Sequence, residues 1–276
     1  MSTITAVIVC RNDNYGGNLT HRAHHSLTTL CNQFDEVIYV DWKSPGGASL
    51  LDNNTLLPSN LKHIKITKEF LENNLPQYID YAIVESIGRN VGVRRATGDW
   101  ILSTNIDVLV NRPDLNSLDQ NTLYTGRRYN VPIEEHLNIR NPLKLFTYCK
   151  ENKHRFSAAR DASKGNESFN DPGDFYSLVV CCGDFQLAHK SLWNKMQGFE
   201  EECAGRSYAD SNLMKKGFLH GKISLLEPLD LFHLNHGTES SKQPGEILPL
   251  NDQQKFVANF TQTTNTENWG LAQHNL

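Results

Sequence analysis

Two polar side chains, Asn105 and Asp107, follow a run of apolar and β-branched residues that begins at Trp100. The segment 100–110 comes directly after a Gly-Asp turn and is typical of a central strand covered on both faces. Because successive side chains of a strand point to opposite faces, we expect Asn105 and Asp107 on the same side, at the strand's carboxyl end. Ligands of open α/β sheets bind at that end. The sequence therefore predicts a binding site here.

The Asp107 carboxylate is a candidate metal ligand. Carboxylate oxygens hold hard divalent cations, and such a cation can neutralise the negative charge of a departing diphosphate. His233 and His236 can complete the coordination shell, since neutral imidazole suits Mn²⁺. We predict that Asp107 and His236 hold Mn²⁺ or Mg²⁺, with His233 as the alternative ligand. A solvated aspartate and two structural histidines are the competing interpretation.

Polar residues also follow three other predicted strands. If these strands are parallel neighbours, their carboxyl ends converge on one crevice. There Asp41 could accept hydrogen bonds from a uracil or guanine edge or from a ribose hydroxyl, although it also fits the start of a turn. The residues concerned are Arg11 and Asp13 after the strand 4–10, Asp41 in the strand 36–42, and Asp184 after a strand that begins near Ser177.

Arg89 and Asn90 are expected to begin a helix whose small residues Gly92 and Ala96 pack closely on the sheet. A guanidinium group offers a planar fork of donors that suits phosphate oxygens, so Arg89 is a candidate ligand of a diphosphate. A surface arginine paired with a carboxylate explains this residue equally well. Three histidines, His21, His24 and His25, are interpreted as a solvated helix face without an assigned role.

The elements that must position these residues alternate between strands and helices in the first half. Strands are predicted at 4–10, 36–42 and 61–67, and apolar residues between 19 and 34 recur at helical spacing. This order favours a mainly parallel sheet with helices on both faces. In the second half, a long polar stretch at 134–174 is expected to form loops. Strand-like 177–187, helix-like 190–196 and 210–216, and strand-like 230–234 follow.

Composition limits the possible classes. A chain of 276 residues can bury one large core or two small ones. The formal net charge of -4 argues against a nucleic-acid partner, which would require a basic surface. Neither a signal-peptide pattern nor a membrane span is found, which predicts a cytoplasmic protein. The six cysteines show neither zinc-site spacing nor a secreted disulfide pattern.

The order of these features resembles that of GT-A fold glycosyltransferases, and most closely the large family 2 type of nucleotide-sugar enzymes. The resemblance spans about residues 4 to 238. In the first half it depends on the segments Val7 to Asp13, Glu36 to Asp41, Arg89 to Asp99 and Asn105 to Asp107. In the second half it depends on Gly183 to Trp193, Gly198 to Glu200, Tyr208 to Leu213 and Phe232 to His236.

The resemblance implies an α/β, Rossmann-like GT-A domain over 1–276, with a mainly parallel central sheet and a smaller acceptor-side subregion. Residues 1–115 would form the nucleotide-sugar-binding half, 116–239 the acceptor-binding and catalytic half, and 240–276 a polar tail. It implies a hexosyl- or pentosyltransferase that moves a sugar from a nucleoside-diphosphate sugar to a hydroxyl of a glycan or small acceptor. UDP is favoured over GDP, and inversion at the anomeric carbon is expected.

The resemblance also implies roles for individual residues. Asp210 is the first choice for the base that deprotonates the acceptor, although a helix N-cap explains it too. Asp184 is the second choice, or it holds a sugar hydroxyl. The family usually has an aspartate where this chain has Asn105, so lower metal affinity is expected. The expected nucleotide-sugar ligands are Arg11, Asp13, Asp41, Arg89, Asn90 and Asn105.

Other classes stay open. A nucleotidyltransferase would need a glycine-rich, basic first loop to hold a triphosphate, whereas the loop 11–17 has only late glycines and an acid. A zinc hydrolase is disfavoured, because the glutamate of the zincin helix motif is missing. A sugar-binding or scaffold protein that keeps the fold without activity is the alternative outside enzymes, and Asn105 leaves it open.

Overall fold

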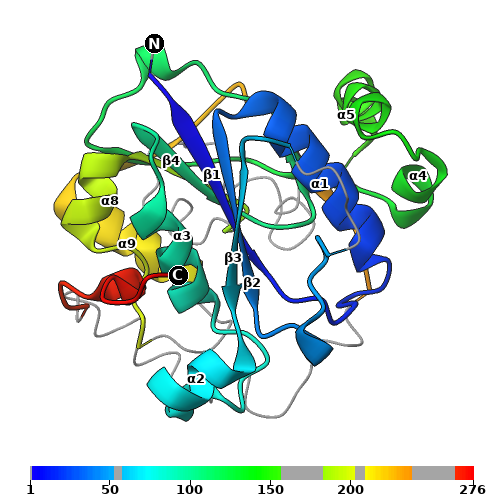
Figure 1. Cartoon of the computed structure of the whole chain (residues 1–276). Helices are drawn as coiled ribbons and strands as arrows, with labels where there is room; N and C mark the ends of the chain where they lie inside the picture. The colour runs from blue at the N-terminus through cyan, green and yellow to red at the C-terminus, as the bar shows by residue number, and fades with distance from the viewer. Residues whose placement is uncertain (1, 53–57, 157–182, 203–208, 238–264) are drawn as a thin grey trace, which may run out of the picture.

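The computed structural model describes residues 2–52, 58–156, 183–202, 209–237 and 265–276. A seven-stranded sheet runs through the centre in the order β3-β2-β1-β4-β8-β6-β9 (Figure 1). Its strands are β1 (Ile4–Cys10), β2 (Glu36–Trp42), β3 (Leu61–Ile66), β4 (Trp100–Thr104), β6 (Thr122–Thr125), β8 (Phe185–His189) and β9 (Lys222–Leu225). The three strands predicted in the first sixty-odd residues are confirmed.

The direction of the strands decides where their ends meet. β1 pairs in parallel with β2 and β4, β2 with β3, and β6 with β9. β8 lies between β4 and β6 and is antiparallel to both. The sheet is therefore mainly parallel, as predicted, and the start of β8 lies at the same edge as the end of β4. Asp184 reaches that edge because it precedes an antiparallel strand, not because it ends a parallel one.

Helices cover both faces of the sheet (Figure 1). Alternating side chains of β1 explain this: Ile4, Ala6 and Ile8 are buried in the cluster that includes α1 (Leu19–Gln33), whereas Val7 and Val9 are buried with the opposite layer. That layer consists of α3 (Glu85–Arg95), α8 (Lys190–Met196) and α9 (Ala209–His220). Both faces of the central strands are apolar, as a parallel sheet requires.

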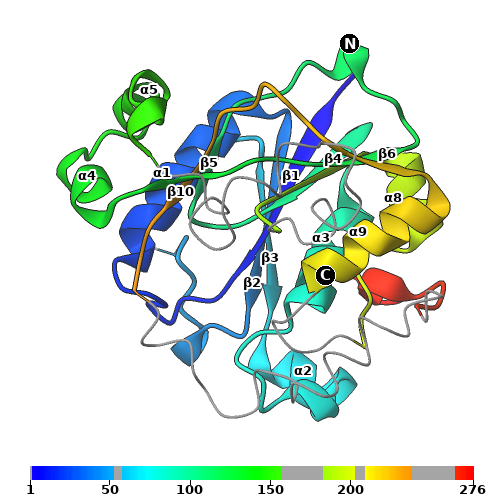
Figure 2. The same cartoon turned by 180° about the vertical axis from the view of Figure 1, so that it is seen from behind.

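One expectation about the middle of the chain is wrong. The segment 100–110 is not one strand: β4 ends at Thr104, and β5 (Val108–Val110) belongs to a second sheet of order β5-β10-β7 (Figure 2). Thr104 is the last residue that pairs with β1 and with β8, so the chain leaves the first sheet at Asn105. The other strands of the second sheet are β7 (Tyr129–Val131) and β10 (Leu231–Leu234).

Two further boundaries differ. The polar stretch expected to form loops contains α4 (Ile133–Asn138) and α5 (Pro142–Glu151), because Leu145, Phe146 and Cys149 form an apolar face on α5. Helix α3 begins at Glu85, so Arg89 lies in its second turn rather than at its start. The remaining described α-helix is α2 (Lys68–Asn74). Parts of the predicted loops, strand and tail, at residues 157–182 and 240–264, lie outside the described residues.

Within the described ranges, no helix combines the length and apolar character needed to cross a membrane.

A buried ion pair anchors α9 beneath the second half of the sheet. The Nζ of Lys216 lies 3.6 Å from Oε2 of Glu200, and both side chains are almost fully buried. Burial lowers the pKa of Lys216 to about 8, although the Glu200 charge opposes that shift. We predict that Lys216→Met lowers the free energy of unfolding by about 3 kcal/mol, because the buried Glu200 carboxylate loses the positive charge of Lys216. Denaturant unfolding followed by circular dichroism measures this.

The exposed Lys222 provides the matched control. It pairs with Asp119 at the surface, so Lys222→Met should change the free energy of unfolding by no more than about 0.5 kcal/mol. Adding Glu200→Gln to Lys216→Met should restore part of the lost stability, since the uncompensated charge is then removed. An unchanged stability of the single Lys216→Met variant would contradict the role of the ion pair.

Candidate active site

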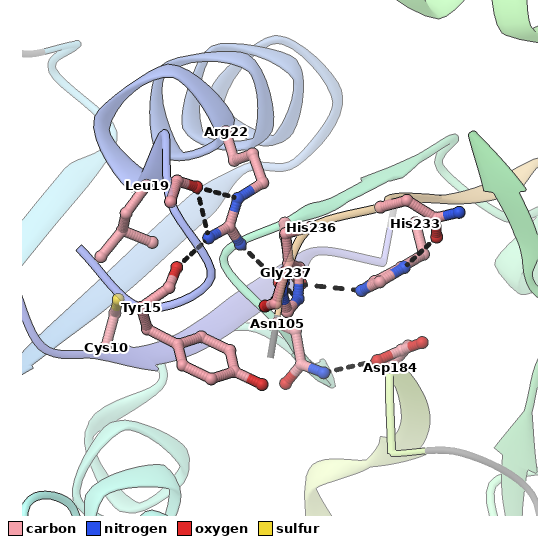
Figure 3. Close-up of polar contacts among 12 residues, drawn as sticks. Cys10, Tyr15, Leu19, Arg22, Asn105, Asp184, His233, His236 and Gly237 are labelled. Carbon is pink, nitrogen blue, oxygen red and sulfur yellow. Dashed lines mark hydrogen bonds and ion pairs between the residues drawn. The ribbon is translucent and has the colours of Figure 1, made fainter. Parts of the chain in front are cut away.

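His233 and His236 lie close together near the end of the central sheet (Figure 3). Asp107 lies next to both of them. Oδ2 of Asp107 lies 3.1 Å from Nε2 of His236 and 3.8 Å from Nε2 of His233. Their potential ligand atoms all lie within 4.8 Å of one another. β5 and β10 pair directly beside this point, which brings residue 107 next to residues more than 120 positions later in the chain. The three residues predicted as metal ligands are therefore brought together.

The charge state of Asp107 suits a cation. Burial alone would raise the pKa of its carboxyl, but the neighbouring imidazoles and the Arg22 guanidinium outweigh burial and hold the pKa well below its usual range. Asp107 is therefore ionised throughout the physiological range. Its Oδ1 is buried and has no hydrogen-bond partner among the described residues. A buried, ionised and unpartnered oxygen beside two imidazoles is a donor set that fits a divalent cation.

The orientation of His236 is fixed by its second nitrogen. Nδ1 lies 2.7 Å from the carbonyl oxygen of Gly237 and donates to it, which fixes the ring with Nε2 facing Asp107. Gly16 packs directly against this ring with φ +68°, and a Cβ there would collide with Nδ1 of His236. The loop after β1 therefore needs glycine at position 16.

Arg22 is a site residue that we did not predict. Its side chain has no exposed surface, and Nη1 donates to Oδ2 of Asp107 at 2.9 Å. The other guanidinium nitrogens donate to the carbonyl oxygens of Tyr15 and Gly17 (Figure 3). Arg22 lies on the apolar stripe of α1, three residues after Leu19, and a charged residue in such a stripe is the signal that could have identified it.

A second group of charged and polar side chains surrounds Asn105. Its Oδ1 accepts a hydrogen bond from Arg89, and its Nδ2 donates to Oδ1 of Asp184. Oδ2 of Asp184 accepts from Arg128, which the sequence analysis also missed. Arg89 additionally donates to Oγ of Ser103 at 2.8 Å. Arg89 and Arg128 therefore belong to one hydrogen-bond network, in which the Asn105 amide and the Asp184 carboxylate lie between them.

Asp210 lies beside this network, in the first turn of α9. Its Oδ1 accepts from the Ser211 backbone N–H at 2.8 Å, and its Cβ packs against Gly183, where any added Cβ would come within 2.9 Å. Burial raises the pKa of the Asp210 carboxyl above its ordinary value, and the charges of Glu85 and Asp184 act in the same direction. Asp210 is inside the helix, so the N-cap alternative does not describe it.

Two neighbouring cavities adjoin the end of the sheet, and Arg11 lines both. The first, of about 440 Å³, is also lined by Asp13, Asn105, Asp107 and both histidines of the triad. The second, of about 480 Å³, is lined by Asp41 and the turn that follows β2. Asp41 accepts a hydrogen bond from Ser44 and lies 3.9 Å from Nε2 of His63. The predicted polar strand ends therefore converge on one edge.

Two expectations about individual residues differ from the structure. Asn90 is fully buried, with its amide bonded to both the N–H and the C=O of Phe199 and to Glu201, so it positions the turn after α8 and does not line either cavity. His25 is wholly buried beside His21, so the three histidines of α1 do not form a solvated face. Burial lowers the pKa of His25 to about 4.

Solved structures with the same architecture are found, whereas no protein-family profile and no curated protein matches the sequence. S. aureus TarS 1–349 in complex with UDP-GlcNAc superposes with a TM-score of 0.54 at 15% identity, over 94% of this chain and 71% of that one. GalNAc-T7 with UDP, GalNAc and Mn²⁺ gives a TM-score of 0.53 at 11% identity, over 86% of this chain and 44% of that one.

These neighbours identify the fold. The chain has the GT-A fold, with the mainly parallel sheet and two helical layers described above. It spans 60% of another TarS 1–349 structure and 37% of a longer TarS chain, so it is shorter than the proteins that it matches.

Proposed function

We propose that this protein is a glycosyltransferase that uses a nucleoside-diphosphate sugar, with UDP favoured over GDP. The observation that carries the proposal is the triad of Asp107, His233 and His236 in a cavity next to the one lined by Asp41. A nucleotide sugar needs such an arrangement, with a base site and a diphosphate site side by side. The UDP-GlcNAc complex of TarS and the UDP and Mn²⁺ complex of GalNAc-T7 support the same choice of donor.

The donor would lie across both cavities, which are lined mostly by residues 1–115 and, on the diphosphate side, also by Arg128, His233 and His236. Asp41 would accept hydrogen bonds from the base or ribose, and Asp13 lies in the loop that lines the diphosphate side. The Arg11 guanidinium, which lines both cavities, would contact the diphosphate between them. Asn90 is left out of this proposal, because all its amide groups are occupied.

Asp107, His233 and His236 would hold Mn²⁺ or Mg²⁺, since the unpartnered Oδ1 of Asp107 and the two imidazoles fit a divalent cation. When bound, the cation would supply positive charge that stabilises the diphosphate as a leaving group.

The transfer step would use residues of the second half, 116–239. Asp210 would take the proton of the acceptor hydroxyl while that oxygen bonds to the anomeric carbon and the bond from this carbon to the diphosphate breaks, with the electron pair leaving on the diphosphate. Asp184 is held on both oxygens by Asn105 and Arg128, so it would orient a sugar hydroxyl rather than act as a base. Attack opposite the leaving group would invert the anomeric carbon.

Calorimetry with UDP, GDP and CDP, each with and without Mn²⁺, tests the proposal. We expect UDP to bind most tightly and its affinity to increase with Mn²⁺, after which a panel of UDP-sugars in a hydrolysis assay identifies the donor. Binding of none of these nucleotides would contradict the proposal and favour a scaffold protein.

Asp41→Asn should weaken UDP binding by about tenfold, because a hydrogen bond to a charged acceptor is replaced by one to a neutral amide. The affinity for Mn²⁺ should not change, since Asp41 lies in the other cavity. Calorimetry measures both affinities. Asp119→Asn, an exposed acid outside both cavities, is the control and should bind UDP as the unmodified protein does. Equal UDP affinity of Asp41→Asn and the control would exclude Asp41 from the nucleotide site.

A further inference from the structure

We infer that Arg22 couples metal binding to nucleotide binding, by offsetting the charge of the Asp107 carboxylate until a diphosphate arrives. This inference rests on the proposed function, and it concerns a residue that would touch neither substrate. Arg22 would be a positioning residue that acts through the Asp107 carboxylate.

The contacts of Arg22 support a role beyond packing. Its guanidinium is completely buried, and Nη1 holds Oδ2 of Asp107 at 2.9 Å. The other oxygen of this carboxylate, Oδ1, has no hydrogen-bond partner within the described part of the chain. Arg22 therefore occupies one oxygen of the only carboxylate in the triad and leaves the other one free.

The charges of Asp107 and Arg22 cancel before a cation enters. Asp107 contributes one negative charge and Arg22 one positive charge, and the two groups are in direct contact. Hard divalent cations bind in proportion to the anionic oxygens around them, and a fixed positive charge a few ångströms away opposes them. Asn105 adds no charge where a second carboxylate would have helped. A diphosphate supplies the missing negative charge, so the cation should bind well only together with it.

The loop between β1 and α1 links Arg22 to the nucleotide side. Arg22 donates to the carbonyl oxygens of Tyr15 and Gly17, while the carbonyl oxygen of Gly16 accepts from the Gly237 N–H at 2.9 Å. The edge of the Tyr15 ring packs on His236 with 4.9 Å between ring centres. The same loop lines the cavity of the triad through Tyr15 and Asp13. Arg22 is thus placed where the metal ligands and the nucleotide loop meet.

Titration of the full chain with Mn²⁺, followed by electron paramagnetic resonance of free Mn²⁺, tests this. In the unmodified protein we expect UDP to raise the Mn²⁺ affinity by at least about tenfold, and Mn²⁺ to raise the UDP affinity by the same factor. Arg22→Met should bind Mn²⁺ about tenfold more tightly without UDP, because a repelling charge is removed, and the coupling factor should fall accordingly. Arg22→Lys keeps the charge and should stay within about threefold of the unmodified protein.

The outcomes separate charge from packing. If Arg22 only braces the loop, both variants should lose Mn²⁺ affinity, which would overturn the inference. Equal tightening in Arg22→Met and Arg22→Lys would also overturn it. Should Arg22→Met fail to fold, the unmodified protein still decides, since Mn²⁺ affinity that is independent of UDP is incompatible with the inference. Failure of the unmodified protein to bind UDP at all would instead overturn the proposed function.

Discussion

Replacing Asp107 by asparagine should lower kcat/KM for sugar transfer by about a thousandfold. Asparagine has almost the same shape and can still accept the hydrogen bond from Arg22, so the loss comes from the negative charge. Asp107 is the one carboxylate in the triad, and without it two imidazoles and an arginine face the diphosphate site. Transfer assays with the donor identified by hydrolysis, together with Mn²⁺ titration, measure both consequences.

Two controls accompany this variant. One is a measurement of its thermal stability, and the other is the substitution of a distant acid. Asp107→Asn leaves the buried Arg22 without its counter-charge, so the midpoint of thermal unfolding should fall as well. Assays are therefore run well below that midpoint, with circular dichroism as the check on folding. Asp119→Asn removes an exposed acid and should retain full activity. A folded Asp107→Asn protein with normal turnover would exclude a metal role for this residue.

Local sequence patterns were sufficient to predict the strands and the helix of the proposed donor-binding half. β1 and β2 are short, continuously apolar strands, and the helical spacing of Leu19, Ala23 and Leu27 identifies α1, because these signals depend on the segment alone. The break at Asn105 was missed for the same reason. Whether a chain continues in a sheet beyond residue 104 depends on β1 and β8, which lie elsewhere in the sequence and whose pairing with β4 ends at that residue.

The sequence predicts those site residues that the order of strands and helices along the chain is sufficient to identify. A carboxylate and two imidazoles suit one cation, so the sequence alone predicts that Asp107, His233 and His236 share a site. Arg22 has no motif of its own, and its role arises from a contact across 85 positions. For Asn90 the sequence predicts a role that the structure does not support. Although Asn90 is next to Arg89 in sequence, its side chain points to Phe199 in the turn after α8 and not to the site.

Asp210→Asn should lower kcat by about a hundredfold to ten-thousandfold and leave the affinity for UDP unchanged. The amide keeps the size of the side chain at Gly183 but cannot take a proton from the acceptor. Asp184→Asn is the comparison. Because the Asp184 carboxylate is held by Asn105 and Arg128, this substitution is expected to affect KM for the donor more than kcat. If Asp184→Asn shows the larger loss in kcat, the roles of the two acids are exchanged.

The pH profile provides a second test of Asp210. A base works only when ionised, and burial raises the pKa of this carboxyl, so kcat should fall as the pH is lowered through a midpoint above the ordinary aspartate value. Above that midpoint the rate should be independent of this group. The same acid limb should be absent from the residual activity of Asp210→Asn and present in that of Asp184→Asn. An acid limb that survives in Asp210→Asn would assign it to another group, because an amide cannot titrate in this range.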